Sequence, residues 1–185
     1  MTTDRDPRDE IVEHLSALRA FALSLTGRPD AADDLVQDCI ERAWRAFGSY
    51  RPGTNMRAWL FTILRNSFYS SRRRLSREVQ DSDGILTATL AQRPAHDGRL
   101  ALNDFHAAFQ RLPVEQREAL MLVGASGFSY DEAAAMCGVP SGTMKSRANR
   151  ARRRLAELLQ LEDGEGPTIS DMTVVAAMPD GGGLS

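Results

Sequence analysis

The sequence is poor in the residues that build disulfide frameworks, metal centres and membrane spans. It has two cysteines, Cys39 and Cys137, which lie far apart and belong to no CxxC pattern, so we expect buried free thiols. The three histidines have no metal-ligand spacing to one another or to the cysteines. No apolar run approaches the ~20 residues that a spanning helix needs. We therefore expect no metal ion and no membrane partner.

Signatures of catalysis and of export are missing as well. The chain contains no nucleophile elbow, no phosphate-binding loop and no dinucleotide fingerprint. Its first residues, MTTDRDPRDE, are charged and lack the apolar stretch of a secretory signal. The sequence thus predicts a cytoplasmic protein that is not an enzyme and uses no cofactor.

Charge is abundant, and it is sorted into blocks along the chain. The formal net charge is −2, yet residues 41–80 carry nine basic and two acidic side chains. Residues 145–154 hold six basic side chains and no acidic one. Two basic blocks on a slightly acidic chain indicate two surfaces for a polyanion. For either block taken alone, a solvated helix face is an equally good interpretation.

Apolar residues recur at helical spacing, and no stretch shows sustained strand alternation. One stripe covers residues 11–25 and ends at Gly27, a second covers 36–47 and includes Trp44, and a third begins at Met56. The predicted fold class is all-α, with two small helical domains joined by a linker. The expected units are residues 1–75, a linker at 76–97 with a short helical turn near 85–90, residues 98–161, and an acidic, disordered tail at 162–185.

The C-terminal domain carries the pattern of a helix-turn-helix. Ser129 and Glu132 form a capping box, Gly138 suits a tight turn, and Ser141 can cap the next helix. That next helix has an apolar stripe of Met144, Ala148, Ala151, Leu155 and Leu158, with basic and polar side chains beside it. A helix of this kind is typical of proteins that read the DNA major groove.

Two further surfaces allow either a functional or a purely structural interpretation. The segment MRAWLFTILRNSFYSSRRR at 56–74 interleaves aromatic and basic side chains, which suits single-stranded nucleic acid. Alternatively, its Phe61 and Phe68 are ordinary core residues and its arginines a solvated end. Acidic residues on one face of the preceding helix can dock a basic partner or merely favour the helix dipole.

The two patterned blocks resemble the extracytoplasmic-function sigma factors, which are the promoter-specificity subunits of bacterial RNA polymerase. The matching stretches are ADDLVQDCIERAWRAFGSYRPGTNMRAWLFTILRN at 32–66 and LPVEQREALMLVGASGFSYDEAAAMCGVPSGTMKSRANRARRRL at 112–155. The second block is most similar to the general-stress branch of alphaproteobacteria. The acidic tail is not part of the family pattern.

The resemblance implies partners and site residues. Residues 1–75 would be sigma region 2, which binds core RNA polymerase and the opened minus-ten element, and 98–161 would be region 4, which reads the minus-thirty-five element. Promoter DNA, duplex and single-stranded, and a small anti-sigma protein are the other implied partners. The implied polymerase contacts are Asp34, Leu35, Gln37 and Asp38; the minus-ten contacts are Phe61, Arg65, Asn66 and Tyr69; the minus-thirty-five contacts are Lys145, Ser146, Arg147, Asn149, Arg150 and Arg152.

Two other functions remain open at this point. A sigma-like decoy would bind an anti-sigma protein instead of DNA, but it has little need for a cationic reading helix or for Asn66. A plain helix-turn-helix regulator would bind duplex DNA, but it leaves the block at 32–66 unexplained. Co-purification with core RNA polymerase separates a sigma factor from such a regulator.

Overall fold

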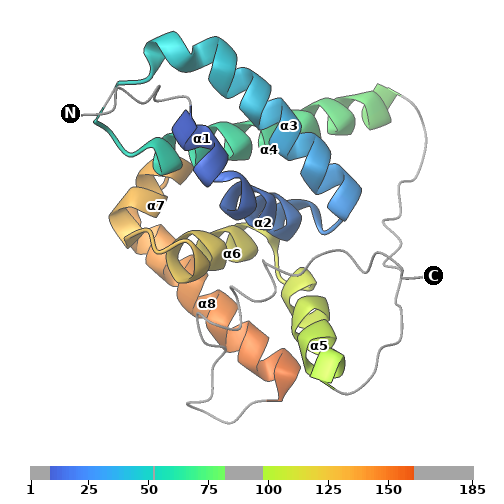
Figure 1. The fold of residues 1–185 in the computed structure, drawn as a ribbon. Helices are drawn as coiled ribbons and strands as arrows, with labels where there is room; N and C mark the ends of the chain where they lie inside the picture. The colour runs from blue at the N-terminus through green and yellow to red at the C-terminus, as the bar shows by residue number, and fades with distance from the viewer. Residues whose placement is uncertain (1–8, 52, 82–97, 161–185) are drawn as a thin grey trace.

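A computed structural model describes residues 9–51, 53–81 and 98–160, and every regular element in these ranges is helical (Figure 1). The predicted all-α class is therefore confirmed. The helical turn predicted near 85–90 and the acidic tail at 162–185 lie outside the described residues. No helix within the described ranges is both long and apolar enough to cross a bilayer.

The described residues of the N-terminal half form four α-helices. They are α1 (Asp9–Glu13), α2 (Leu15–Thr26), α3 (Pro29–Ala46) and α4 (Met56–Asp81), with a 3-10 turn, η1 (Phe47–Ser49), after α3. The first apolar stripe is divided between α1 and α2, which meet at His14. Gly27 ends α2 as predicted: its φ is +71°, and its N–H donates to the Leu23 carbonyl. Helix α4 continues through the first residues of the predicted linker.

The C-terminal half holds the helix-turn-helix. Its elements are α5 (Gly98–Gln110), α6 (Val114–Ala119), a π-helical segment η2 (Leu120–Ala125), α7 (Tyr130–Cys137) and α8 (Ser141–Leu159). The capping box is confirmed, because the Ser129 N–H donates to Glu132 Oε2 at 2.8 Å and the Glu132 N–H donates to Ser129 Oγ at 3.2 Å. Gly138 ends α7 at φ +65°.

The prediction that Ser141 caps α8 is wrong. Pro140 is the N-cap residue, and no side chain caps this end of α8. The Pro140 carbonyl already accepts the first helical hydrogen bonds, from the N–H groups of Thr143 and Met144 at 2.9 and 3.1 Å. Ser141 is consequently the first residue inside the helix.

Both halves contribute to one continuous core. Helix α2 lies against α6, and α4 lies against α7, as Figure 1 shows. The Phe61 ring of α4 stacks on the Phe21 ring, with 4.9 Å between the ring centroids. It also meets the Phe128 ring of the C-terminal half edge to face, with 5.4 Å between the centroids. In this structure, the two halves are packed together.

Trp44 departs from the expected pattern on α3. The second stripe placed it in the core, yet it is 51 % exposed. The buried face of α3 runs through Leu35, Cys39 and Ala43, four residues apart, so Trp44 lies about 100° around the helix from Ala43. Cys39 and Cys137 are free and buried as predicted, and burial raises the pKa of each thiol to about 12.

The capping box generates a stability prediction for the helix-turn-helix. We expect Ser129→Ala to lower the free energy of unfolding by about 1 kcal/mol, because it removes the acceptor for the Glu132 N–H. Urea denaturation followed by circular dichroism measures the change. Ser71→Ala, an exposed position inside α4, is the matched control and should cause no loss. Equal stability of the two variants would show that the cap contributes nothing.

Candidate nucleic-acid interface

Helix α8 presents a cationic face opposite a buried stripe. Met144, Ala148, Ala151 and Leu155 are 0 % exposed and hold the helix on the C-terminal half. Of the predicted duplex-DNA contacts, three are exposed and three are half-buried. The exposed ones are Lys145, Asn149 and Arg150, and the half-buried ones are Ser146, Arg147 and Arg152.

Hydrogen bonds orient two of these arginines on the α8 surface. Arg150 donates from Nη2 to Ser146 Oγ at 3.0 Å and from Nε to the Ser146 carbonyl at 3.2 Å. Arg152 donates from Nη1 to Asn149 Oδ1 and to the Tyr130 hydroxyl, both at 3.3 Å. Because Tyr130 opens α7, Arg152 links the two helices of the helix-turn-helix. The face offers guanidinium and amide donors that match phosphates and base edges.

The predicted polymerase contacts lie on α3. Asp34 and Gln37 are exposed, and Asp38 is half-buried and accepts from Arg42 Nε at 2.8 Å. Leu35 is only 8 % exposed and packs in the core. Leu35 therefore helps to hold α3 on the core, and the polar side chains of the predicted set are the ones open to a partner.

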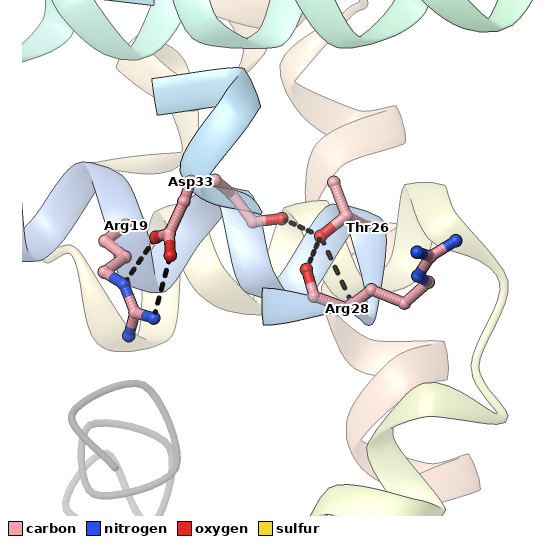
Figure 2. Close-up of polar contacts among 5 residues, drawn as sticks. Arg19, Thr26, Arg28 and Asp33 are labelled. Carbon is pink, nitrogen blue, oxygen red and sulfur yellow. Dashed lines mark hydrogen bonds and ion pairs between the residues drawn. The ribbon is translucent and has the colours of Figure 1, made fainter. Parts of the chain in front are cut away.

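Contacts at the turn between α2 and α3 set the orientation of this acidic face (Figure 2). Arg19 of α2 donates from Nε to Asp33 Oδ1 at 2.7 Å. Thr26 Oγ1 donates to the Ala22 carbonyl at 2.9 Å and lies 3.1 Å from the Arg28 carbonyl. The ion pair and the threonine hydrogen bonds hold the start of α3 against the end of α2. They thereby fix the orientation of the acidic face of α3 relative to α2.

The predicted minus-ten contacts lie on α4, where the structure separates one from the other three. Asn66 is exposed, whereas Phe61 is 1 % exposed and Tyr69 is half-buried. The Arg65 side chain is 17 % exposed and forms an ion pair with a fully buried carboxylate, that of Glu118 on α6. Phe61 thus satisfies the alternative interpretation from the sequence, in which it is a core residue.

Glu118 binds two of the predicted DNA contacts at once. Arg65 Nε donates to its Oε1 at 2.6 Å, and the Tyr69 hydroxyl donates to its Oε2 at 3.4 Å. The Arg65 guanidinium also lies over the Tyr69 ring, 4.6 Å from its centroid. Sequence reasoning missed Glu118, whose only signal was an acidic side chain directly before the apolar run Ala119-Leu120-Met121-Leu122.

The Glu118 cluster is largely shielded from water. Burial raises the pKa of Glu118 and outweighs the attraction of Arg65. For Arg65, burial works to lower the pKa, but the Glu118 carboxylate outweighs it and the pKa is raised. Burial also raises the pKa of Tyr69, which stays protonated and able to donate.

Neighbouring contacts continue the interface between the two halves. Arg117 Nη2 donates to the Leu25 carbonyl at 3.1 Å, at the C-terminal end of α2. The Arg57 guanidinium lies over the rings of Phe61 and Phe128, at 5.5 and 5.4 Å. We call this interface the seam; it comprises Leu25, Arg57, Phe61, Arg65 and Tyr69 on one side and Arg117, Glu118 and Phe128 on the other.

The charged and polar groups on these surfaces are suited to binding other macromolecules. Over the described ranges, no three histidine, cysteine or acidic side chains gather as a metal site. Cations and an amide on α8 and α4, with an acidic face on α3, can recognise a polyanion and a basic protein surface.

Comparison with known proteins agrees with this arrangement. The family models that match are sigma-70 region 2, over residues 11–78, and sigma-70 region 4, over residues 102–155. The ECF RNA polymerase sigma factor EcfG of Rhodopseudomonas palustris is 51 % identical, covering 95 % of this chain and 96 % of that protein. The ECF RNA polymerase sigma factor SigM of Mycobacterium tuberculosis is 34 % identical, covering 84 % and 79 % respectively.

Solved structures show a similar relationship. The sigma factor RpoE in complex with the anti-sigma factor NepR, from Bartonella quintana, matches with a TM-score of 0.76 and 54 % identity. That match covers 85 % of this chain and 98 % of RpoE. The PhyRSL-NepR complex of Sphingomonas sp. Fr1 matches with a TM-score of 0.63 at 19 % identity, covers 84 % and 90 %, and shows likeness of fold alone.

The raised pKa of Glu118 predicts how stability depends on pH. A carboxyl group with a raised pKa in the folded state stabilises that state fully below its ordinary pKa of 4.5, and the contribution is lost as pH rises through the folded pKa. Glu118→Gln is neutral at every pH and lacks this loss. We therefore expect the free energy of unfolding of the variant, relative to wild type, to increase as pH rises above 4.5.

Urea denaturation at a series of pH values measures this difference. Asp104→Asn, which changes an exposed carboxylate of α5, is the control and should run parallel to wild type. If the Glu118→Gln curve also ran parallel to wild type, burial would not govern the proton affinity of Glu118.

Proposed function

Because the chain belongs to the extracytoplasmic-function RNA polymerase sigma factors, we propose that it directs the polymerase to promoters by reading duplex DNA with α8 and separated bases with α4. The observation that carries this proposal is the cationic face of α8, which stands exposed over a fully buried stripe. A sigma factor selects start sites and leaves the chemistry to the polymerase. The protein would act in the cytoplasm.

Helix α8 would supply the minus-thirty-five readout. Lys145, Asn149 and Arg150 are exposed and carry the donors that pair with base edges in the major groove. The exposed Arg153 and Arg154 follow along the helix and suit phosphates, which position the protein without reading sequence. Base contacts worth about 1–3 kcal/mol each would set the choice of promoter.

On α4, Asn66 is the best-supported contact with the minus-ten element. It is exposed, and its amide offers both a donor and an acceptor to an unpaired base. Arg65 and Tyr69 would join it only after Glu118 has moved away, because the carboxylate occupies both in this structure. Phe61 would contribute by fixing α4 on α2, since its ring stacks on Phe21.

The acidic face of α3 would bind the core polymerase. Asp34 and Gln37 are open to a partner, and Asp38 can exchange its exposed ion pair with Arg42 for a basic side chain of that partner. Leu35 supports the face from inside the core.

A small anti-sigma protein would regulate the chain, and general stress genes would be its targets. The Bartonella quintana sigma factor, 54 % identical, is bound to the anti-sigma factor NepR in its solved structure. The resemblance of residues 112–155 to the general-stress branch, together with 51 % identity to EcfG, supports the same assignment. The fold is shared with the PhyRSL domain, but the cationic face of α8 favours DNA over a decoy role.

Asn66→Ala tests the base-binding role in run-off transcription with purified core polymerase. We expect promoter opening to fall by about ten-fold or more, because the variant loses the amide contacts to an unpaired base. Ser71→Ala, also exposed on α4, should transcribe like wild type. Normal opening by Asn66→Ala would remove Asn66 from the minus-ten site.

Two substitutions on α8 separate sequence readout from phosphate binding. With duplex promoter DNA and the assembled holoenzyme, Arg153→Ala should weaken binding to all sequences alike and reduce the salt slope of log K by about 0.9. Arg150→Ala should instead reduce discrimination between matched and mismatched minus-thirty-five elements by about 1–3 kcal/mol per base pair contacted. Identical behaviour of the two variants would contradict this division of roles.

A further inference from the structure

We propose that the acidic C-terminal tail, residues 162–185, binds the cationic face of α8 in the same chain and competes there with duplex DNA. This inference rests on the proposed function, because it takes α8 as the helix that meets duplex DNA. The competing ligand is a segment of defined chemistry, with five carboxylates and no cation. Duplex DNA would then bind α8 by displacing the tail.

The folded part of the chain leaves much of the positive charge on α8 unbalanced. Lys145, Arg150 and Arg153 are exposed, and no carboxylate of residues 9–51, 53–81 or 98–160 forms an ion pair with them. Among the exposed cations of this face, Arg154 is the one that is paired, through Nη1 with Glu157 Oε2 at 2.9 Å. The face therefore offers three exposed charges to a further anion.

The tail carries the complementary charge. It holds five acidic side chains and no basic one, whereas residues 145–154 hold six basic side chains and no acidic one. The acidic residues of the tail are Glu162, Asp163, Glu165, Asp171 and Asp180. Because both charged segments belong to one chain, a short tether holds them at an effective concentration of the order of millimolar. Even a weak attraction between them is then sufficient for binding.

The covalent connection also puts the whole face within reach of the tail. Gln160 ends α8 in the left-handed conformation, at φ +54°, so the tail begins at the C-terminal end of the cationic helix. The distance from Gln160 back to Lys145 is about 22 Å along the helix axis, since each residue adds ~1.5 Å. An extended chain gains ~3.3 Å per residue, so about seven of the twenty-four tail residues cover this distance.

Helix stability does not explain why acidic residues follow α8. The C-terminal end of a helix carries a partial negative charge, which favours cations and disfavours carboxylates there. Helix α8 has no basic side chain in its last turn, and Glu162, Asp163 and Glu165 come within five residues of its C-cap. Contact with Arg153 and Arg154, about two turns earlier on α8, would offset this unfavourable placement.

A contact of this kind is weak enough for DNA to displace. Exposed ion pairs are weak one by one, because water and salt screen them, and DNA can replace each of them with a phosphate. Duplex DNA carries a charge every ~1.7 Å of its axis, a higher density than the tail offers. Competition lowers the affinity for every duplex by the same factor, so weak non-specific complexes of the free protein are lost first.

The only lysine in the sequence allows a direct test of the contact. That lysine is Lys145, which lies on the cationic face. A carbodiimide joins an amine to a carboxylate that touches it as an amide. We expect tryptic peptides of the full-length monomer, treated at low salt, to contain an amide between Lys145 and a carboxylate of residues 162–185. Excess duplex DNA, or high salt, should suppress this product.

The cross-link has internal controls. Exposed carboxylates of the helices, such as Glu41 and Asp104, should give no such amide with Lys145. Absence of the tail product, while Lys145 still reacts with a small acylating reagent, would overturn the contact. So would a product distributed evenly over all exposed carboxylates.

Removal of the tail charge tests the competition with DNA. The tail variant changes its five carboxylates to amides in the full-length chain: Glu162→Gln, Asp163→Asn, Glu165→Gln, Asp171→Asn and Asp180→Asn. We expect its dissociation constant for a short fluorescein-labelled duplex of random sequence to be about ten-fold below that of wild type at low salt, because the competent fraction rises. The difference should vanish at high salt, which screens the tail from α8.

A matched variant separates the tail from the net charge. It changes five exposed carboxylates of the helices to amides: Glu10→Gln, Glu13→Gln, Asp30→Asn, Glu41→Gln and Asp104→Asn. The net charge rises by the same amount in both variants, so the long-range attraction to DNA is alike. The matched variant should gain much less affinity than the tail variant. Equal gains would overturn the competition.

The results separate this inference from the proposed function. The cross-link reports whether the tail lies on α8, whatever α8 binds. Arg150→Ala and Arg153→Ala, measured with the same duplex, report whether α8 holds DNA. If Arg153→Ala weakened binding but the tail variant gained nothing over the matched variant, the competition alone would be overturned. If neither alanine variant weakened binding, the role of α8 in DNA binding would fall, and the competition with it.

Discussion

The carboxylate of Glu118, buried against Arg65 and Tyr69, is the interaction on which the arrangement of the two halves depends. A charge of this kind persists in a dry interface only when donors surround it, and here Arg65 and Tyr69 of the opposite half and Cys137 of its own half donate to it. The apolar contacts around it, such as Phe61 with Phe128, follow from that placement. The packing of α6 on α2 and of α7 on α4 thus combines this ion pair with the hydrogen bond from Arg117 and the apolar contacts of Phe61 and Phe128.

The two helices proposed to read DNA are therefore unequally exposed in this structure. The cationic face of α8 is open, so duplex DNA can meet Lys145, Asn149 and Arg150 directly. Of the predicted minus-ten contacts on α4, only Asn66 is exposed, while Arg65 and Tyr69 are hydrogen-bonded to Glu118.

The elements that sequence reasoning placed well are those with local causes. The capping box at Ser129, the positive φ of Gly138 and the buried stripe of α8 each depend on residues within a few positions of one another. The errors have tertiary or competing causes. Trp44 fell one residue outside the buried face of α3, and α8 has Pro140 instead of Ser141 as its N-cap residue. For Phe61 the sequence allowed both a base-stacking and a core interpretation, and packing against Phe21 places it in the core.

By itself, the sequence determined the helical class, the helix-turn-helix with its cationic helix, and the family, because periodicity, caps and motifs are written in neighbouring residues. Only the tertiary structure decided which of the predicted DNA contacts are exposed to solvent and which are buried or bound by Glu118. That outcome rests on Glu118 and Arg65, which are fifty-three positions apart. No local pattern predicts such a pair, because a glutamate that becomes buried has the same sequence signal as one that stays exposed. The difference arises only when folding brings the carboxylate to its donors.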